Sequence, residues 1–158
     1  MADLPPPIPS APLWIGMAAL VPLLGAALLL LSTDPMLART ALSAFCIYAA
    51  AMLSFLGGVR WGFEISRAPE RPNAARLVYA TAPTLGGWAL ALCVVSDPRV
   101  QGASMIFSGL FAVQYVWDKA SAREQLAPPW YPLLREVLTG GAMLACVMLM
   151  FAFSIKRF

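Results

Sequence analysis

Residues 41–61, ALSAFCIYAAAMLSFLGGVRW, decide the fold, because this stretch carries no charge until it reaches Arg60. A helix needs about 20 mostly apolar residues to cross the hydrocarbon core of a bilayer, and this stretch provides them. Four further stretches have the same character: residues 12–32, 77–96, 101–117 and 133–154, of which 101–117 is the shortest. We therefore predict an all-α bundle of five transmembrane helices, with residues 1–158 forming a single integral membrane domain.

The composition of the whole chain agrees with a membrane protein. Of its 158 residues, 60% are hydrophobic and 12% are charged, and this charged share is about half that of a soluble domain. Such a composition excludes a water-soluble domain, a disordered chain and a disulfide scaffold. The sequence also contains no histidine. This excludes histidine-ligated zinc, bis-histidine haem and Ser-His-Asp triads within the chain.

The distribution of Lys and Arg predicts the orientation of the bundle. Five crossings place the two ends of the chain on opposite sides of the membrane. The N-terminal side would carry Arg60, Arg67, Arg71, Arg76, Lys119, Arg123 and Arg135. The other side would carry Arg39, Arg99, Lys156 and Arg157. Because cytoplasmic loops are enriched in Lys and Arg, we predict a cytoplasmic N-terminus and a periplasmic C-terminus. Most Trp and Tyr residues would lie at that same N-terminal side, as expected for a membrane interface.

The segments outside the five stretches are short. The proline-rich start, Leu4–Pro12, is expected to be non-helical. It has no Lys or Arg before the first apolar stretch, so we do not expect a cleavable signal peptide. Between Asp118 and Pro128 there is room for a short interfacial helix.

Small residues recur every four positions along the second stretch. On a helix they form a smooth face that lets a neighbouring helix approach closely in lipid. The residues that we predict to pack helices are Ala50, Ser54, Gly57, Gly58 and Gly62. We favour packing inside the bundle, and a seam between copies of the chain is the alternative.

Several charged and polar residues should meet at the predicted cytoplasmic ends of the second, fourth and fifth stretches. The predicted network consists of Arg60, Glu64, Gln114, Asp118, Arg135 and Glu136. Opposite charges in this layer should pair, because pairing lowers the cost of removing them from water. We expect an Arg60–Asp118 or a Glu64–Arg135 bridge. Arg60 is interpreted as an interfacial anchor with a local partner, and the alternative is a fixed cation that faces a polar pocket.

The third stretch contains three residues that weaken a helix. Pro83 removes a backbone hydrogen bond and predicts a kink, which Gly86 and Gly87 would enhance. Transporters use broken helices of this kind, although kinks are also common in plain bundles. The three cysteines lie within the apolar stretches at spacings that match no metal motif. We predict no catalytic residue, no metal and no cofactor.

Residues 53–62, LSFLGGVRWG, resemble the central motif of a membrane family catalogued as a domain of unknown function. That family includes the mitochondrial transmembrane protein 69 of animals. Residues 114–118 and 130–135 resemble its later motifs in the same order, and the resemblance runs from about residue 13 to residue 154. It implies a small multi-span protein of bacterial inner or mitochondrial membranes, with no established activity to carry over. Since a transit-peptide pattern is lacking, we expect a multi-pass protein of the bacterial inner (cytoplasmic) membrane.

Two functions fit these features. The first is an accessory, assembly or interaction subunit of a larger membrane complex, with the lipid bilayer as its solvent and a membrane protein or further copies of itself as partner. The second is a small transporter or channel with a polar site near Arg60 and the Pro83 kink. An enzyme is less favoured, and no nucleic-acid partner is expected.

Overall fold

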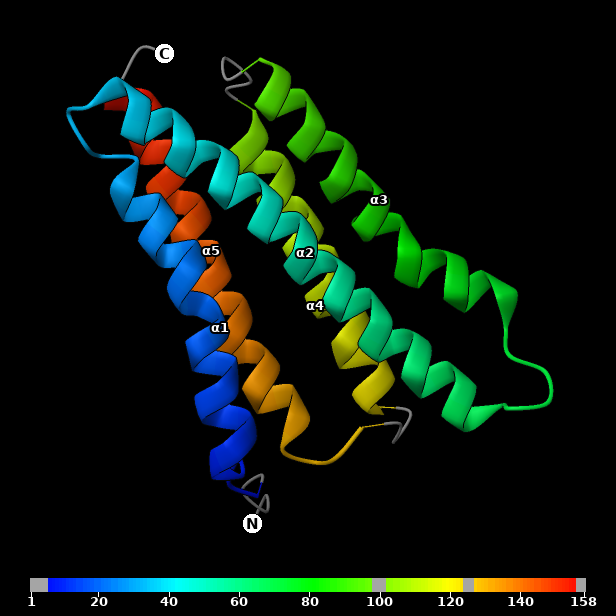
Figure 1. The fold of residues 1–158 in the computed structure, drawn as a ribbon. Coiled ribbons are helices and arrows are strands. Elements are labelled where there is room, and N and C mark those ends of the chain that lie inside the picture. The colour runs from blue at the N-terminus through cyan, green and yellow to red at the C-terminus, as the bar shows by residue number, and fades with distance from the viewer. Residues whose placement is uncertain (1–5, 98–101, 124–126, 156–158) are drawn as a thin grey trace.

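A computed structural model describes residues 6–97, 102–123 and 127–155 (Figure 1). Within these ranges the protein consists of five helices: α1 (Ser10–Leu29), α2 (Pro35–Arg67), α3 (Ala74–Ser96), α4 (Ala103–Arg123) and α5 (Tyr131–Ile155). Successive helices run in opposite directions, and α1 begins at the opposite end of the bundle from the end of α5 (Figure 1). The predicted all-α bundle is confirmed. We call the end at which α1, α3 and α5 begin the N-terminal end of the bundle.

Four of the helices, α1, α2, α3 and α5, are long and apolar enough to cross a membrane. The remaining helix, α4, is less apolar than these four, because it carries Gln114, Asp118 and Lys119 near its end. It is nevertheless 21 residues long, or about 31 Å at 1.5 Å per residue, which matches the hydrocarbon thickness. The crossing by α4 stays a prediction, and so does the orientation of the chain. Three of the charges used for the orientation, Arg99, Lys156 and Arg157, lie outside the described residues.

The helix boundaries follow local chemistry. Asp34 caps α2 by accepting a hydrogen bond from the backbone N of Met36 at 2.8 Å, and Pro35 occupies the first turn, where its missing N–H is not needed. Helix α1 already begins at Ser10. The prediction that the chain is non-helical up to Pro12 is therefore wrong for the last three residues of that segment. Pro12 is tolerated because it also lies in a first turn.

Two helices end well after the predicted apolar stretches. Helix α2 has 33 residues and continues to Arg67, and α4 continues to Arg123. The residues after Asp118 thus prolong α4, in place of a separate interfacial helix, as far as the described part of the chain reaches. Polar residues can continue these helices because helical hydrogen bonding does not depend on an apolar environment.

The helices enclose an apolar core. Helix α2 contacts α1, α3 and α4, while α5 contacts α1 and α4. Phe45 of α2 and Phe107 of α4 pack edge to face, with ring centroids 6.2 Å apart, and Leu53 and Leu149 are fully buried beside them. Large apolar side chains also cover the outside of the bundle. This distribution is expected when lipid takes the place of water around a protein.

Candidate functional site

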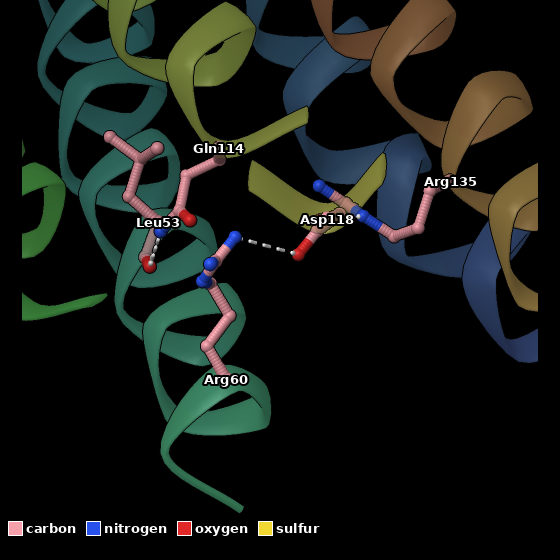
Figure 2. Close-up of polar contacts among 5 residues, drawn as sticks. All are labelled: Leu53, Arg60, Gln114, Asp118 and Arg135. Atoms are coloured by element: carbon pink, nitrogen blue, oxygen red, sulfur yellow. Dashed lines mark hydrogen bonds and ion pairs between the residues drawn. The ribbon is translucent and has the colours of Figure 1, made fainter. Parts of the chain in front are cut away.

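At the N-terminal end of the bundle, two arginines share one carboxylate (Figure 2). Arg135 of α5 donates a hydrogen bond from Nε to Oδ2 of Asp118 in α4. Nη1 of Arg60 in α2 lies 3.6 Å from Oδ1 of the same carboxylate. The structure therefore contains the Arg60–Asp118 pair expected from the sequence. In addition, it has an Arg135–Asp118 pair that was not expected.

This cluster of Arg60, Asp118 and Arg135 is buried. The side chains of Asp118 and Arg135 are 2% and 5% exposed, and that of Arg60 is 16% exposed. Charges are expensive to bury unless they are paired, so Asp118 and the two arginines that pair with it stabilise one another's burial only through the carboxylate. Because the three side chains come from α2, α4 and α5, their pairing also fixes how these helices meet.

Gln114 extends the cluster by one turn along α4. It is fully buried, and its Nε2 lies 3.5 Å from the carbonyl oxygen of Leu53 in α2 (Figure 2). The hydroxyl of Thr84 in α3 donates to the same carbonyl at 3.4 Å. These contacts link α2, α3 and α4 just inside the charged cluster. Gln114 is thus placed with the network, as a hydrogen-bonding neighbour and not as a member of the ion pairs.

Aromatic side chains surround the outer side of the cluster. The guanidinium carbon of Arg60 lies 5.3 Å from the centre of the Trp117 ring, a cation–π distance. Trp117 in turn packs against Tyr79 of α3 with ring centroids 5.8 Å apart. Trp61 donates from Nε1 to the hydroxyl of Thr81 at 3.1 Å. Trp117 thus connects Arg60 of the cluster to Tyr79 of α3.

Glu64 lies outside this cluster, so the predicted Glu64–Arg135 bridge is wrong. Because α2 continues to Arg67, Glu64 is carried past the cluster to the start of α3. There its carboxylate accepts a hydrogen bond from the backbone N of Asn73 at 2.8 Å. It also lies 3.7 Å from the guanidinium nitrogens of Arg67 and Arg76. Glu64 thus ties the end of α2 to the start of α3.

Glu136 is also separate from the cluster. It accepts a hydrogen bond from the hydroxyl of Tyr115 at 2.6 Å and lies 3.0 Å from Nζ of Lys119. Successive residues on a helix point about 100° apart. For this reason Asp118 and Arg135 face the interior, while Lys119 and Glu136, one residue further along each helix, face outward.

The small residues of α2 divide into a buried and an open set. A Cβ atom at Gly57 would lie 2.6 Å from the carbonyl oxygen of Ala80, so Gly57 permits the close approach of α2 to α3. A Cβ atom at Gly58 or at Gly62 would meet nothing within 4 Å. Both of these glycines and Ser54 are exposed on the outside of the bundle. We call Ser54, Gly58 and Gly62 the open face of α2.

Helix α3 is continuous through Pro83, Gly86 and Gly87. Pro83 is buried, and a Cβ atom at Gly87 would lie 2.7 Å from Cδ1 of Leu53 and 3.5 Å from Cα of Ala50. Gly87 and Ala50 therefore form a second close contact between α2 and α3. The helix is not unwound here, and a kink at Pro83 stays a prediction.

A cavity of about 700 Å³ lies between α1, α2 and α5 beside the charged cluster. Its walls are mostly apolar, and Arg135 is part of them. In the described part of the chain, no group of three or more Cys, Asp or Glu side chains is arranged to hold a metal ion.

Residues 8–151 match a protein family described as a protein of unknown function (DUF3429). The chain belongs to this family. The resemblance seen in residues 53–62 is therefore confirmed. The match spans all five helices and includes Arg60, Asp118 and Arg135.

Two relatives indicate how far the similarity extends. The chain is 35% identical to transmembrane protein 69 of Xenopus tropicalis over 140 residues, which cover 88% of this chain and 53% of the relative. It is 36% identical to transmembrane protein 69 of Mus musculus over 88 residues, which cover 53% of this chain and 34% of that relative. The chain thus spans about half or less of the length of these curated relatives. No solved structure matches the chain. These findings show a membrane protein of a family with unknown function.

Proposed function

We propose that the protein is an accessory or assembly subunit of a larger membrane complex and that it binds a transmembrane helix of another protein. The observation that carries this proposal is the open face of α2, formed by Ser54, Gly58 and Gly62. In lipid, helices associate through faces of small residues that let their backbones approach. Such a face on the outside of the bundle provides a binding surface for a transmembrane helix of a partner protein.

The two glycines of the open face have no close packing contact within the described part of the chain. Glycine in a helix interior is less favourable than alanine by about 0.5–1 kcal/mol. Gly58 and Gly62 make no close contact that would offset this cost. Gly57 and Gly87 already provide the close contacts between α2 and α3. A partner helix that packs against Gly58 and Gly62 would explain why small residues stand there.

The surroundings of the open face suit an apolar helix. A shallow groove runs beside it between α2 and α3, and Ser54 lies in this groove together with Leu85 and Trp88. Trp88 is 59% exposed, so it can pack along the side of a bound helix. The connections between α1 and α2 and between α2 and α3 are short. Contacts with a partner would therefore be made mainly through the helices.

A small transporter or channel is the second candidate. The observation that favours it is a buried charged cluster beside a cavity. A transport path for a polar substrate would need polar walls, however, and the walls of this cavity are mostly apolar. The continuous course of α3 through Pro83 also gives less support to a substrate site built on a broken helix. We therefore favour the interaction role.

Photo-crosslinking inside the native membrane tests the interaction role. A crosslinking amino acid is placed at Ser54 on the open face, and the matched control carries it at Leu144 of α5, which is 55% exposed. We expect one discrete adduct with a foreign membrane protein from position 54 and none from position 144. Adducts only with lipid, or only with a second copy of the chain, would overturn the proposal.

A pair of double variants provides the second arm. Gly58→Ile with Gly62→Ile should abolish co-purification of the crosslinked partner in mild detergent, because the added side chains hold the helices apart. The control, Gly109→Ile with Gly140→Ile, places the same side chains at two other exposed glycines. It should leave the complex intact. An equal loss of co-purification in both double variants would contradict a specific binding surface on α2.

The location and orientation belong to the same proposal. We propose a bacterial inner membrane protein with its N-terminus in the cytoplasm, because the sequence places more Lys and Arg on that side. A reporter enzyme that is active only in the periplasm, fused after Phe158, should be active. An inactive reporter would place the C-terminus in the cytoplasm and contradict the proposed orientation.

A further inference from the structure

We propose that the cavity between α1, α2 and α5 binds one molecule of an anionic phospholipid. An acyl chain of the lipid occupies the cavity, and an oxygen of its phosphate accepts a hydrogen bond from Arg135. This inference goes beyond the interaction role proposed for the open face of α2. It concerns a different side of α2 and different residues.

The shape of the bundle creates the cavity. Helices α1 and α2 are joined at one end and diverge toward the N-terminal end (Figure 1). The space between them is bounded at the back by α5 and holds about 700 Å³, which is within the range of about 300–1,000 Å³ for ligand sites. Its walls include Ile15, Met52, Phe55 and Leu138. Such walls suit a hydrocarbon chain.

Among the described residues that line the cavity, Arg135 is the one with a charged side chain. Its side chain is 5% exposed, and its Nε is occupied by Asp118. Its Nη2 is buried and has no hydrogen-bond partner among the described residues. A guanidinium group offers five N–H donors, and buried donors are normally satisfied. The unpartnered nitrogen therefore points to an acceptor that comes from a ligand.

The order of residues along the cavity matches the order of groups in a lipid. Trp130 and Tyr131 lie at the N-terminal end of the cavity, where aromatic rings are typical of the headgroup level. Arg135 follows one helical turn further in, and Thr139 and Ala142 lie deeper still. A phosphate at the level of Arg135 would thus place its acyl chain among the apolar walls.

The charge of the site favours an anionic headgroup. Arginine binds phosphate oxygens more strongly than it binds neutral acceptors, because its hydrogen bonds are then charge-assisted. Asp118 carries one negative charge and is shared by Arg60 and Arg135. Basic pockets between transmembrane helices are a general way in which proteins hold anionic lipids. A zwitterionic lipid such as phosphatidylcholine also presents a phosphate, but its choline cation cancels the net charge of the headgroup, so it would gain less from the cation of Arg135.

Native mass spectrometry of the full chain in a neutral detergent tests the proposal. Phosphatidylglycerol and phosphatidylcholine with identical acyl chains are the two probes. We expect a one-to-one adduct with phosphatidylglycerol at concentrations about tenfold lower than with phosphatidylcholine, which is about 1.4 kcal/mol. Equal binding of the two lipids, or binding of neither, would overturn the proposal.

Arg135→Gln tests the role of the cation. In this variant Asp118 keeps its ion pair with Arg60, and the glutamine can still donate a hydrogen bond to the carboxylate. The preference for phosphatidylglycerol should disappear, while binding of phosphatidylcholine should remain. The matched control is Arg71→Gln, which removes an exposed charge in the α2–α3 connection and should keep the preference. Retention of the preference by Arg135→Gln would overturn the assignment.

A cavity-filling variant keeps the test decisive if Arg135→Gln does not fold. Ala19→Phe places a ring in the wall of the cavity without changing any charged residue. Its neighbour Ala18 is exposed on α1 and is not among the lining residues, so Ala18→Phe is the control. We expect Ala19→Phe to lose the adducts of both lipids and Ala18→Phe to keep them. Undiminished adducts in Ala19→Phe would place the lipid elsewhere and contradict the proposal.

Discussion

Two ion pairs join α4 to α5 at adjacent positions, and their surroundings differ completely. Asp118 and Arg135 face the interior, where their side chains are 2% and 5% exposed. Lys119 and Glu136 lie one residue further along each helix and are both 49% exposed. Both pairs join the same two helices, and both lie at the same level of the bundle. The direction in which a side chain points therefore decides whether a charge becomes part of the core or stays at the surface.

This comparison leads to different energetic expectations for the two pairs. Removing one partner from a buried pair leaves the other charge without compensation, which typically costs about 3–5 kcal/mol. An exposed pair is screened by its surroundings and contributes little.

The largest effect is expected for Asp118→Ala. This change leaves Arg135 buried without its carboxylate, so the free energy of unfolding should fall by about 3–5 kcal/mol. Reversible unfolding in mixed detergent micelles measures the difference. Lys119→Ala, at the adjacent position, is the control. If Asp118→Ala unfolded like the control, the cluster would not be the buried site described here.

The next effect concerns another pair of neighbours, Gly57 and Gly58. Gly57→Ala introduces a Cβ atom 2.6 Å from a backbone oxygen of α3, and such overpacking costs about 1–3 kcal/mol. Gly58→Ala meets nothing within 4 Å and should be neutral or stabilising in the isolated protein. The same unfolding measurement compares the two. An equal loss of stability in both would contradict the division between buried and open glycines.

A smaller effect is expected for Glu64→Gln. The amide oxygen of glutamine can still accept the hydrogen bond from the backbone N of Asn73, so only the ion pairs with Arg67 and Arg76 are lost. Glu64 itself is only 4% exposed, but both arginines are more than a third exposed. Water around the arginines screens these pairs, so we expect them to be worth up to about 1 kcal/mol. The decrease in unfolding free energy should stay within that limit. A loss as large as that of Asp118→Ala would mean that the burial of Glu64, and not the exposure of its arginine partners, sets the strength of these pairs.

The smallest effect is expected for Glu136→Gln. Because Lys119 and Glu136 lie on the outside of the bundle, the midpoint of thermal unfolding should stay within experimental error of the unchanged protein. Raising the salt concentration should not alter that result, since exposed charges are already screened. A clear decrease in the midpoint would show that the outer pair is not equivalent to a surface pair.

The course of the helices could be read from the sequence because lipid imposes a simple requirement. Long apolar runs such as residues 41–61 must be helical to satisfy their backbone groups. The end of α4 could not be read in this way. This helix continues with polar residues beyond its apolar run, and an apolar pattern has no signal for that part.

The composition of the charged cluster was predictable only in part. Arg60 and Asp118 could be paired from their common level in the bundle. Arg135 and Glu136 could not be told apart, because the rotation of α5 is set by packing against α1 and α4. A signal was nevertheless present: Arg135 lies four residues before Thr139 and seven before Ala142, on the face that α5 buries.

The division of the α2 glycines into buried and open positions could not be predicted from the sequence. Gly57, Gly58 and Gly62 all fit a packing face, but only the placement of α3 shows that Gly57 is buried and the other two are open. Small-residue spacing marks a face suitable for packing. It does not predict which helix will pack against that face.

A double-mutant cycle of Asp118→Ala and Arg135→Ala tests the central claim, that a buried charged cluster organises this end of the bundle. The cycle compares the unfolding free energies of the two single variants and the double variant, and the coupling energy is their non-additivity. We predict a coupling of more than about 1 kcal/mol, and no measurable coupling in the parallel cycle of Lys119→Ala and Glu136→Ala. Additive effects at Asp118 and Arg135, or equal coupling in the two cycles, would contradict the account.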